Sequence, residues 1–594
     1  EPPVIKPSKQ DTQKDPTINI DGKTALLGDK VYYRVNIDAS RLTDTAYKVW
    51  RLGMTDDYDQ EYLTLDAKHV EILDETGRDR TGEFNIQDKD GVLYAFAKTV
   101  DTQIPATGET VPGDPQPDDL KAYSEKSDKD YDPLKDPSID QSLLGHTYQV
   151  VMPMTVTKVK DGHTVENTAT QVTNDKRDKT NTVTNPLKEI NPTKDVTVQV
   201  GGDSIDGKSV YLNHTFLYRL DSSILPPDRA YQTVTDWGGT DQLATEYDRY
   251  LGNWAVYASR DLYRDGQVLA AKGEKIAGSG FDSSKFGGNL FTVDADDNGK
   301  VTADATQAYL DLVSADNEHE AGWVLYLQCK RIAVADEVPN TWTETINGQP
   351  RESNKVVTKT PDMTPSIHLE KVDTPTLKQD GQERADRDDP KQALKMDADS
   401  IGITFIITNT SKTDPATGDG AWYKASDLNL ADSTIVGDAH VDMDSLTYPD
   451  NWDTLVLKPG ESVSVTGTLK GVKEGDTHTD RAIVTGTPLV ECAPSNGDPF
   501  NDKTDGGEDT DPEYSTGDVT EIDGKQLCAD TQTTSNTDDW NGYRAKPLAS
   551  TGTAVLGLAG GALAVLLAGG SLLVFRKRHY AQGSGRHTAV NAGK

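Results

Sequence analysis

The sequence is poor in several features on which catalytic and nucleic-acid-binding proteins depend. Its 594 residues include 61 Lys and Arg against 97 Asp and Glu, which gives a formal net charge of −36. So negative a chain repels nucleic acid phosphates, which excludes nucleic acid as a partner. The 10 histidines are scattered without metal-ligand spacing, and the sequence has neither a phosphate-binding loop nor a nucleophile elbow. We therefore expect no enzyme within these residues.

Cysteine is scarce, with 3 residues in the whole chain. Cys492 and Cys528 lie in one region rich in Asp, Gly and Thr, and a disulfide between them is predicted if the chain is exported. Cys329 ends an apolar run over residues 324–329. We interpret it as a buried strand thiol rather than a reactive one.

Long apolar runs are almost absent, and the one exception is informative. Residues 553–575 contain no charge, and about 20 such residues suffice to cross a bilayer. The basic run 576–579 follows at once, which predicts that the end of the chain is cytoplasmic. The chain begins at Glu1 without Met or an apolar leader, so we expect a mature form or a C-terminal fragment.

The residues before this span are Leu548, Ala549, Ser550, Thr551 and Gly552. With the apolar span and the basic tail they resemble a sortase cell-wall sorting signal, in which Ala549 replaces the usual proline. The resemblance implies cleavage after Thr551 and its attachment to peptidoglycan at the cell surface, with the membrane span needed only before sorting. An ordinary single-pass membrane protein is the alternative.

Helical signals are sparse, and Thr, Val, Tyr, Asp and Gly recur in patterns that favour strands and turns. Two long segments repeat each other. The turn at 21–23 and the strand ending in Tyr33-Arg34 match the turn at 206–208 and the strand ending in Tyr218-Arg219. The two turns are 185 residues apart, and the same distance separates Lys9 from Lys194. We therefore infer a duplicated domain.

We predict an all-β fold of tandem Ig-like β-sandwich domains, followed by a disordered wall-spanning segment and one C-terminal transmembrane helix. Proline-rich joints mark the boundaries. The predicted parts are a first repeat (1–189), a second repeat (190–362), a different Ig-like surface domain (363–490), a flexible segment with the disulfide (491–546) and the sorting signal (547–594).

The two repeats resemble the C-terminal domains of the antigen I/II family of Gram-positive cell-wall-anchored adhesins. The residues that carry this resemblance are the runs 191–196, 206–208, 248–254, 330–333 and 339–341. The resemblance is good over 190–361, weaker over 1–189, and absent from 366–594 apart from the anchoring signal. It implies an Ig-like sandwich cross-linked by an isopeptide bond between a Lys on the first strand and an Asn on the last.

The chemistry of such a bond needs a neutral lysine amine and a protonated carboxylic acid, and burial favours both. The resemblance places the isopeptide bonds at Lys9 and Asn167 with Asp56, and at Lys194 and Asn340 with Asp236. Several neighbours remain open as alternatives: Asp57, Asp59 and Asp241 as the acids, and Asn181 and Asn354 as the amide donors. In the third domain Lys371 has no matching Asn in the late strand 479–484, so we predict no cross-link there.

A weaker signal concerns metal. Asp294, Asp296 and Asn298 resemble the start of a calcium loop, but Ala305 stands where its last ligand would be. A plain hairpin turn is the favoured interpretation, so we predict no cofactor and keep calcium as an alternative, here or at the acidic cluster 56–59.

The resemblance implies a stalk that presents a binding region to host glycoproteins or matrix proteins. One rival is a pilus subunit, but the sequence has no Tyr-Pro-Lys motif for sortase to link. The other is the wall anchor of an enzyme whose catalytic domain lies upstream.

Overall fold

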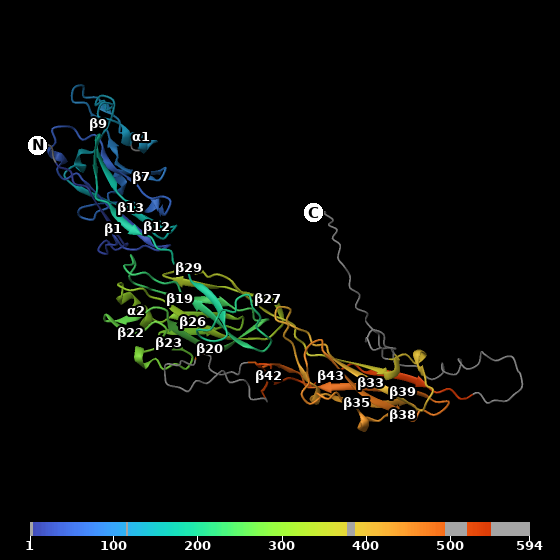
Figure 1. The fold of residues 1–594 in the computed structure, drawn as a ribbon. Coiled ribbons are helices and arrows are strands. Elements are labelled where there is room, and N and C mark those ends of the chain that lie inside the picture. The colour runs from blue at the N-terminus through green and yellow to red at the C-terminus, as the bar shows by residue number, and fades with distance from the viewer. Residues whose placement is uncertain (1–3, 114–116, 377–386, 494–499, 501–518, 548–594) are drawn as a thin grey trace, which may run out of the picture.

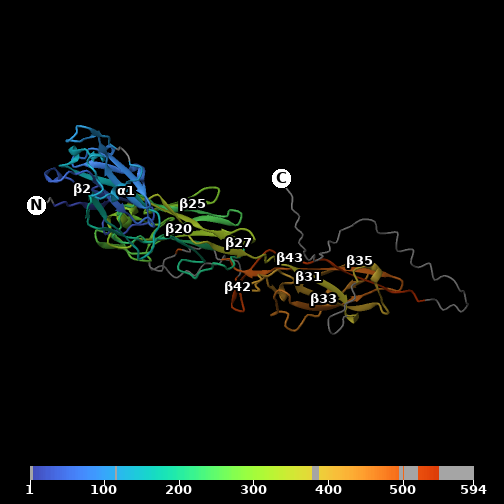
Figure 2. The same cartoon turned by 90° about the horizontal axis from the view of Figure 1, so that it is seen from above.

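The computed structural model describes residues 4–113, 117–376, 387–493, 500 and 519–547. The fold is mostly β, and its α-helices are short: α1 (Leu120–Glu125) and α2 (Gln307–Ala315). Three β-rich units follow one another end to end, coloured blue, green and orange in Figures 1 and 2. No helix in the described ranges has the length and apolar character to cross a membrane.

The first unit contains two main sheets around one core. Along β2 the side chains of Val31, Tyr33, Val35 and Ile37 are all buried, as expected for a strand with one face on the core. The first sheet is ordered β1 (Ser8–Thr12), β2 (Lys30–Asp38), β12 (Thr147–Val156) and β4 (Leu63–Leu65), with β5 (Glu71–Asp74) also on β12. The second is ordered β15 (Lys176–Lys179), β14 (Ala169–Thr173), β3 (Leu52–Asp57), β7 (Val92–Ala97) and β6 (Phe84–Lys89), while β13 (Thr164–Asn167) pairs with β16 (Val183–Pro186).

The second unit repeats this plan with a larger aromatic core, in which Trp237, Trp323 and Trp342 are fully buried. Its first sheet is ordered β17 (Thr193–Thr197), β18 (Thr215–Asp221), β26 (Trp323–Arg331), β20 (Asp248–Ala258) and β23 (Lys275–Gly278). Its second is ordered β24 (Phe291–Ala295), β25 (Lys300–Ala305), β19 (Trp237–Gln242), β28 (Trp342–Ile346) and β29 (Gln349–Glu352), while β27 (Ala335–Asn340) pairs with β30 (Val356–Thr360).

The third unit is also built on two sheets. One is ordered β31 (Ile367–Asp373), β33 (Ser400–Asn409), β38 (Ser462–Lys470) and β36 (His440–Val441). The other is ordered β32 (Leu394–Lys395), β44 (Asp538–Tyr543), β39 (Thr477–Gly486) and β35 (Asn429–Val436). A small sheet joins β40 (Leu489–Glu491), β42 (Lys525–Ala529) and β41 (Thr520–Ile522).

The prediction of a flexible segment over 491–546 is wrong for residues 520–543. Strand β44 lies between β32 and β39, and its Trp540 is fully buried in the core of the third unit. A few well-placed apolar residues therefore anchor a segment whose overall composition is polar. The third unit reaches at least to Tyr543 instead of ending at residue 490.

The units are joined by hydrogen bonds and ion pairs as well as by the chain. Between the first and second units, Lys23 pairs with Asp228 at 3.1 Å, and Gln13 donates to the carbonyl of Ala230 at 2.9 Å. Between the second and third, the Tyr211 hydroxyl donates to Asp419 at 2.9 Å. Such contacts restrict bending at the joints.

Candidate functional site

The first unit brings together Lys9 and Asp56, two of the three residues predicted to form a cross-link. Lys9 lies on β1, its side chain is fully buried, and its Nζ contacts the Asp56 carboxylate on β3. The contact crosses from one sheet to the other. Asp56 is completely buried as well, so both partners have left water, which costs free energy unless they interact closely.

Strand register places Asn167 next to this pair. Ala169 lies directly opposite Asp56 in the ladder between β14 and β3, and Asn167 precedes Ala169 by two residues. The Asn167 side chain is buried, and neither amide atom has a hydrogen-bond partner of standard geometry within the described residues. The Tyr33 ring lies beneath the amine, with its centroid 4.6 Å from Lys9 Nζ. A buried amide without partners costs about 1–3 kcal/mol, so its position needs a reason.

The alternative amide donors are occupied elsewhere. Asn181 accepts from the backbone N–H of Lys9 and donates to the Lys9 carbonyl, both at 2.9 Å. Asn354 binds the backbone of Lys194 in the same way, at 2.8 and 2.9 Å. These asparagines hold the lysine strand in place, and their amides point to the backbone rather than to the amine.

In the second unit, Lys194 on β17 contacts Asp241 on β19, and both side chains are buried. Trp342 lies opposite Asp241 in the ladder, and Asn340 precedes Trp342 by two residues. The Asn340 amide is again buried, with no hydrogen-bond partner among the described residues. Tyr218 takes the place of Tyr33, with its ring centroid 4.6 Å from Lys194 Nζ.

The choice of Asp236 as the acid in this unit is wrong, because the structure places Asp241 against the amine. Asp236 precedes β19, is only half-buried, and accepts the backbone N–H of Gly348 at 3.1 Å. The sequence did contain the signal that identifies Asp241. Lys9 and Asp56 are 47 residues apart, and so are Lys194 and Asp241.

Burial lowers the pKa of both lysines. Desolvation is the main cause at Lys9 and at Lys194, and the neighbouring carboxylates Asp56 and Asp241 oppose it. The lowered pKa favours the neutral amine, which is the nucleophilic form. Each of the first two units therefore places an amine with a lowered pKa over a tyrosine ring and against a buried carboxyl group, and strand register brings a buried amide close to that carboxyl group.

The second unit adds a buried network that the sequence did not predict as functional. Arg331 donates to Asp248 at 2.7 Å, and the Tyr218 hydroxyl donates to the other oxygen of Asp248 at 2.8 Å. Arg331 also donates to Thr358 and Thr360 on β30, both at 2.7 Å. The network joins the strand after the lysine to the last strand of the unit and fixes the tyrosine under the amine.

The predicted weak metal site forms a hairpin turn between β24 and β25. Asp296 accepts from the backbone N–H groups of Asn298 and Lys300, both at 2.9 Å, and Asp294 lies at the end of β24. Asp59, in the other acidic cluster, pairs with His163 at 2.9 Å. Across the described ranges, no group of three or more His, Cys, Asp or Glu is arranged to hold a metal ion.

The cysteines occupy two different environments. Cys492 and Cys528 form a disulfide that joins the segments of β40 and β42. Cys329 on β26 is completely buried in the second core, and burial raises the pKa of its thiol well above the ordinary value. A thiol that resists ionisation is a poor nucleophile.

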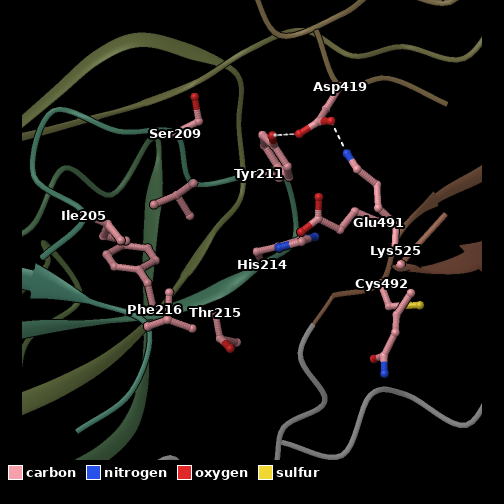
Figure 3. Close-up of a pocket in the computed structure, with 14 residues that line it drawn as sticks. Ile205, Ser209, Tyr211, His214, Thr215, Phe216, Asp419, Glu491, Cys492 and Lys525 are labelled. Atoms are coloured by element: carbon pink, nitrogen blue, oxygen red, sulfur yellow. Dashed lines mark hydrogen bonds and ion pairs between the residues drawn. The ribbon is translucent and has the colours of Figure 1, made fainter. Parts of the chain in front are cut away.

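A cavity of about 610 Å³ lies at the joint between the second and third units. Figure 3 shows Tyr211 and His214 from the second unit facing Asp419, Glu491 and Lys525 from the third. Asp419 accepts from Tyr211 and pairs with Lys525, so the charges of Asp419 and Lys525 neutralise each other. The predicted sorting residues Leu548, Ala549, Ser550, Thr551 and Gly552, with the apolar span, lie outside the described residues.

Two family models match the chain over adjoining ranges. Residues 7–187 match the cell surface antigen I/II C2 terminal domain, and residues 191–361 match the cell surface antigen C-terminus. The aggregation substance of Enterococcus faecalis is 30% identical over 324 residues, which are 54% of this chain and 21% of that protein. The chain thus spans about a fifth of the length of this curated relative.

Among the solved structures that are similar to this chain, two cover a similar share of it. The C-terminal domain of the Streptococcus pyogenes antigen I/II-family protein AspA is 22% identical, with a TM-score of 0.44, and covers 60% of this chain and 100% of its own. The C-terminal domain of the Streptococcus agalactiae AgI/II polypeptide BspA is 18% identical, with a TM-score of 0.43, and covers 59% of this chain and 99% of its own.

Proposed function

Because residues 7–361 of this chain belong to the antigen I/II family of cell-surface proteins, we propose that the chain is the load-bearing stalk of a wall-anchored adhesin, stiffened by intramolecular isopeptide bonds. The family is one of adhesins rather than enzymes, which agrees with the absence of catalytic motifs from the sequence. We assign an Ig-like sandwich fold to each of the three units, since each is built on two main sheets.

The observation that carries the proposal is the pairing of a buried Lys–Asp contact with an unpaired buried amide, repeated in two units. Lys9 and Asn167 form one bond, with Asp56 as the acid, and Lys194 and Asn340 form the other, with Asp241 as the acid. In each reaction the neutral amine attacks the side-chain carbonyl carbon of Asn. The acid donates a proton to the carboxamide and recovers one from the amine, and ammonia leaves as the new amide forms.

The positions of these bonds suit a protein under tension. Lys9 lies on the first strand, and Asn167 lies on β13, which pairs with β16 at the end of the first unit. A covalent link between them carries force past the intervening chain. Closing each loop also removes conformational entropy from the unfolded chain, on the order of 5 kcal/mol by analogy with disulfides.

Anchoring and ligand binding complete the proposal. A sortase would cut after Thr551 and join the chain to peptidoglycan, which places the three units outside the cell. Host glycoproteins or matrix proteins would be the ligands, bound by these units or by a region that they project. The acidic net charge of −36 keeps such a stalk soluble and extended.

The test of the cross-links is the intact mass of the full chain after reduction of its disulfide, followed by peptide mapping. We expect the loss of one ammonia for each bond in the repeats, and linked peptides containing Lys9 with Asn167 and Lys194 with Asn340. Asn167→Ala should abolish the first link. Asn181→Ala removes the rival amide donor, so any cross-link that forms in this variant should still join Lys9 to Asn167, although the variant loses two hydrogen bonds to the Lys9 backbone. Linear peptides from the folded chain would refute the cross-linked stalk.

The ligand assignment has its own test. The immobilised chain is exposed to a panel of extracellular-matrix glycoproteins, each with its deglycosylated form as the control. Saturable binding that depends on the glycan supports a glycoprotein ligand. Absence of binding to every member refutes a ligand site within these residues and leaves the cross-link test unaffected.

A further inference from the structure

The third unit contains a buried lysine in surroundings that resemble those of Lys9 and Lys194. Lys371 lies on β31, its side chain is fully buried, and its Nζ reaches two carboxylates. One is Asp432 on β35. The other is Asp480 on β39, whose Oδ1 lies 2.7 Å from the amine. This unit lies outside the residues that match the family models.

The strand register of this cluster repeats that of the other two. Asp432 lies directly opposite Ala482 in the ladder between β35 and β39, and Asp480 precedes Ala482 by two residues. Asp56 and Asn167 are related in this way through Ala169, and Asp241 and Asn340 through Trp342. Asp432 therefore occupies the position of the acid, and Asp480 occupies the position of the asparagine.

The lysine strand is also held in a similar way, with one difference. Asn536 accepts from the backbone N–H of Leu369 and donates to its carbonyl, both at 2.9 Å, as Asn181 does with Lys9. In the first unit the asparagine binds the backbone of the lysine itself, whereas in the third it binds Leu369, two residues before Lys371. Relative to this asparagine, the lysine of the third unit lies two residues further along its strand. Because side chains two residues apart point to the same face, the cluster remains inside the core.

We propose that Lys371 and Asp480 form a third intramolecular isopeptide bond, with Asp432 as the acid that assists it. The neutral Lys371 amine attacks the carboxyl carbon of protonated Asp480. Asp432 passes the amine proton to the departing hydroxyl, the C–O bond breaks, and water leaves as the amide forms. No oxidant or reductant is needed, since an amine and a carboxylic acid yield an amide and water.

Burial makes this condensation favourable. One ammonium and two carboxylates in a core leave a net negative charge that water cannot screen. Burial and the nearby Asp480 raise the pKa of Asp432 to about 6, although Lys371 opposes them. The buried His478 also faces this cluster, with its Nε2 3.3 Å from Asp480. The amide removes one cation and one anion together, and Asp432 remains to hydrogen-bond to it.

The prediction of no cross-link in this unit rested on the lack of an Asn in strand 479–484. The structure changes that interpretation, because a carboxyl group can supply the same carbonyl carbon as a carboxamide. Only the leaving group differs, water instead of ammonia. The inference uses the chemistry of the proposed function but depends on separate residues.

The test is a tryptic map of the full chain by tandem mass spectrometry. We expect a linked peptide pair containing Lys371 and Asp480, lighter by one water than the sum of its parts, with no cleavage after Lys371. Asp480→Asn, whose side chain has nearly the same shape, should instead give a Lys–Asn cross-link that forms with loss of ammonia. Asp432→Asn should leave Lys371 unlinked in a chain whose first two units remain linked.

Each other outcome counts against the proposal. Cleavage after Lys371 in the folded wild-type chain overturns it, and a link from Lys371 to Asp432 overturns the assignment of roles. The peptides of the repeats are scored in the same digest. If both repeats contain their cross-links and Lys371 is free, only this inference is refuted. If Lys371 is cross-linked and the repeats are not, only the proposed function is refuted.

Discussion

The second unit offers the sharpest test of the stalk hypothesis, through Lys194→Met. Methionine has nearly the length of the lysine side chain and suits the buried site, but it cannot form an amide bond. We expect the variant to lose one ammonia fewer than the wild-type chain. It should also lose the loop-closure stabilisation, on the order of 5 kcal/mol. At about 2–4 °C per kcal/mol for a unit of this size, the melting temperature should fall by roughly 10–20 °C.

Asp241→Asn tests whether the cross-link needs the acid as well as the two residues that it joins. This variant keeps both Lys194 and Asn340 but lacks the acid, so we again expect no cross-link. It also leaves a buried amine without its carboxylate, which adds to the destabilisation. Because Lys194→Met likewise leaves Asp241 buried without its cation, the melting temperatures of the two variants should fall by similar amounts.

The matched control is Asp236→Asn, because Asp236 is half-buried and lies just before the same strand. It should keep the bond and change stability by no more than about 1 kcal/mol. The assay is differential scanning calorimetry of the full chain, in which the unchanged first unit serves as the internal reference. A melting temperature of Lys194→Met equal to that of the control, or loss of the bond in the control, would refute the reasoning.

Three further predictions concern other parts of the chain. Cys528→Ser opens a loop with a sequence separation of 36 and should destabilise the third unit by about 4 kcal/mol, seen in calorimetry as a shift of that unit alone. Burial raises the pKa of Asp11 from 3.8 to about 7, so between these values the native state retains a proton that the unfolded state has lost. The stability of the first unit should therefore fall as the pH rises from about 4 to about 7, and Asp11→Asn should make its stability less dependent on pH. Gly53→Ala should cost about 1–3 kcal/mol, since its Cβ would lie 2.3 Å from the Ala95 carbonyl, whereas Gly82→Ala, with open space around it, should be neutral in urea unfolding.

The local sequence was sufficient to predict the strands and the duplication. Alternating apolar residues in β2 predicted one buried face, and the matching turns at 21–23 and 206–208 predicted two related units. The same comparison related Lys9 to Lys194, while their predicted role in a cross-link came from the resemblance to the antigen I/II family. These features depend on residues that are close together in the chain, where periodicity and turn composition carry the information.

The partners of those lysines were harder to predict from the sequence. Asp236 and Asp241 are both acidic residues near one strand, and the pairing of β19 with β28 shows that Asp241 faces the core beside Asn340. A shift of one residue in register turns a side chain to the other face, so composition alone cannot select the acid. The constant offset between the repeats would have identified Asp241.

The third unit shows what only the tertiary structure decided. From the sequence we could say only that Lys371 has no matching Asn in the late strand 479–484. The sequence did not indicate that Asp432 and Asp480 would meet this lysine in the core, or that the polar stretch 520–543 would supply strands with a buried Trp540. Contacts between residues so far apart depend on how two sheets pack and on the register within each. Those are properties of the whole fold, because no local pattern specifies which strands become neighbours.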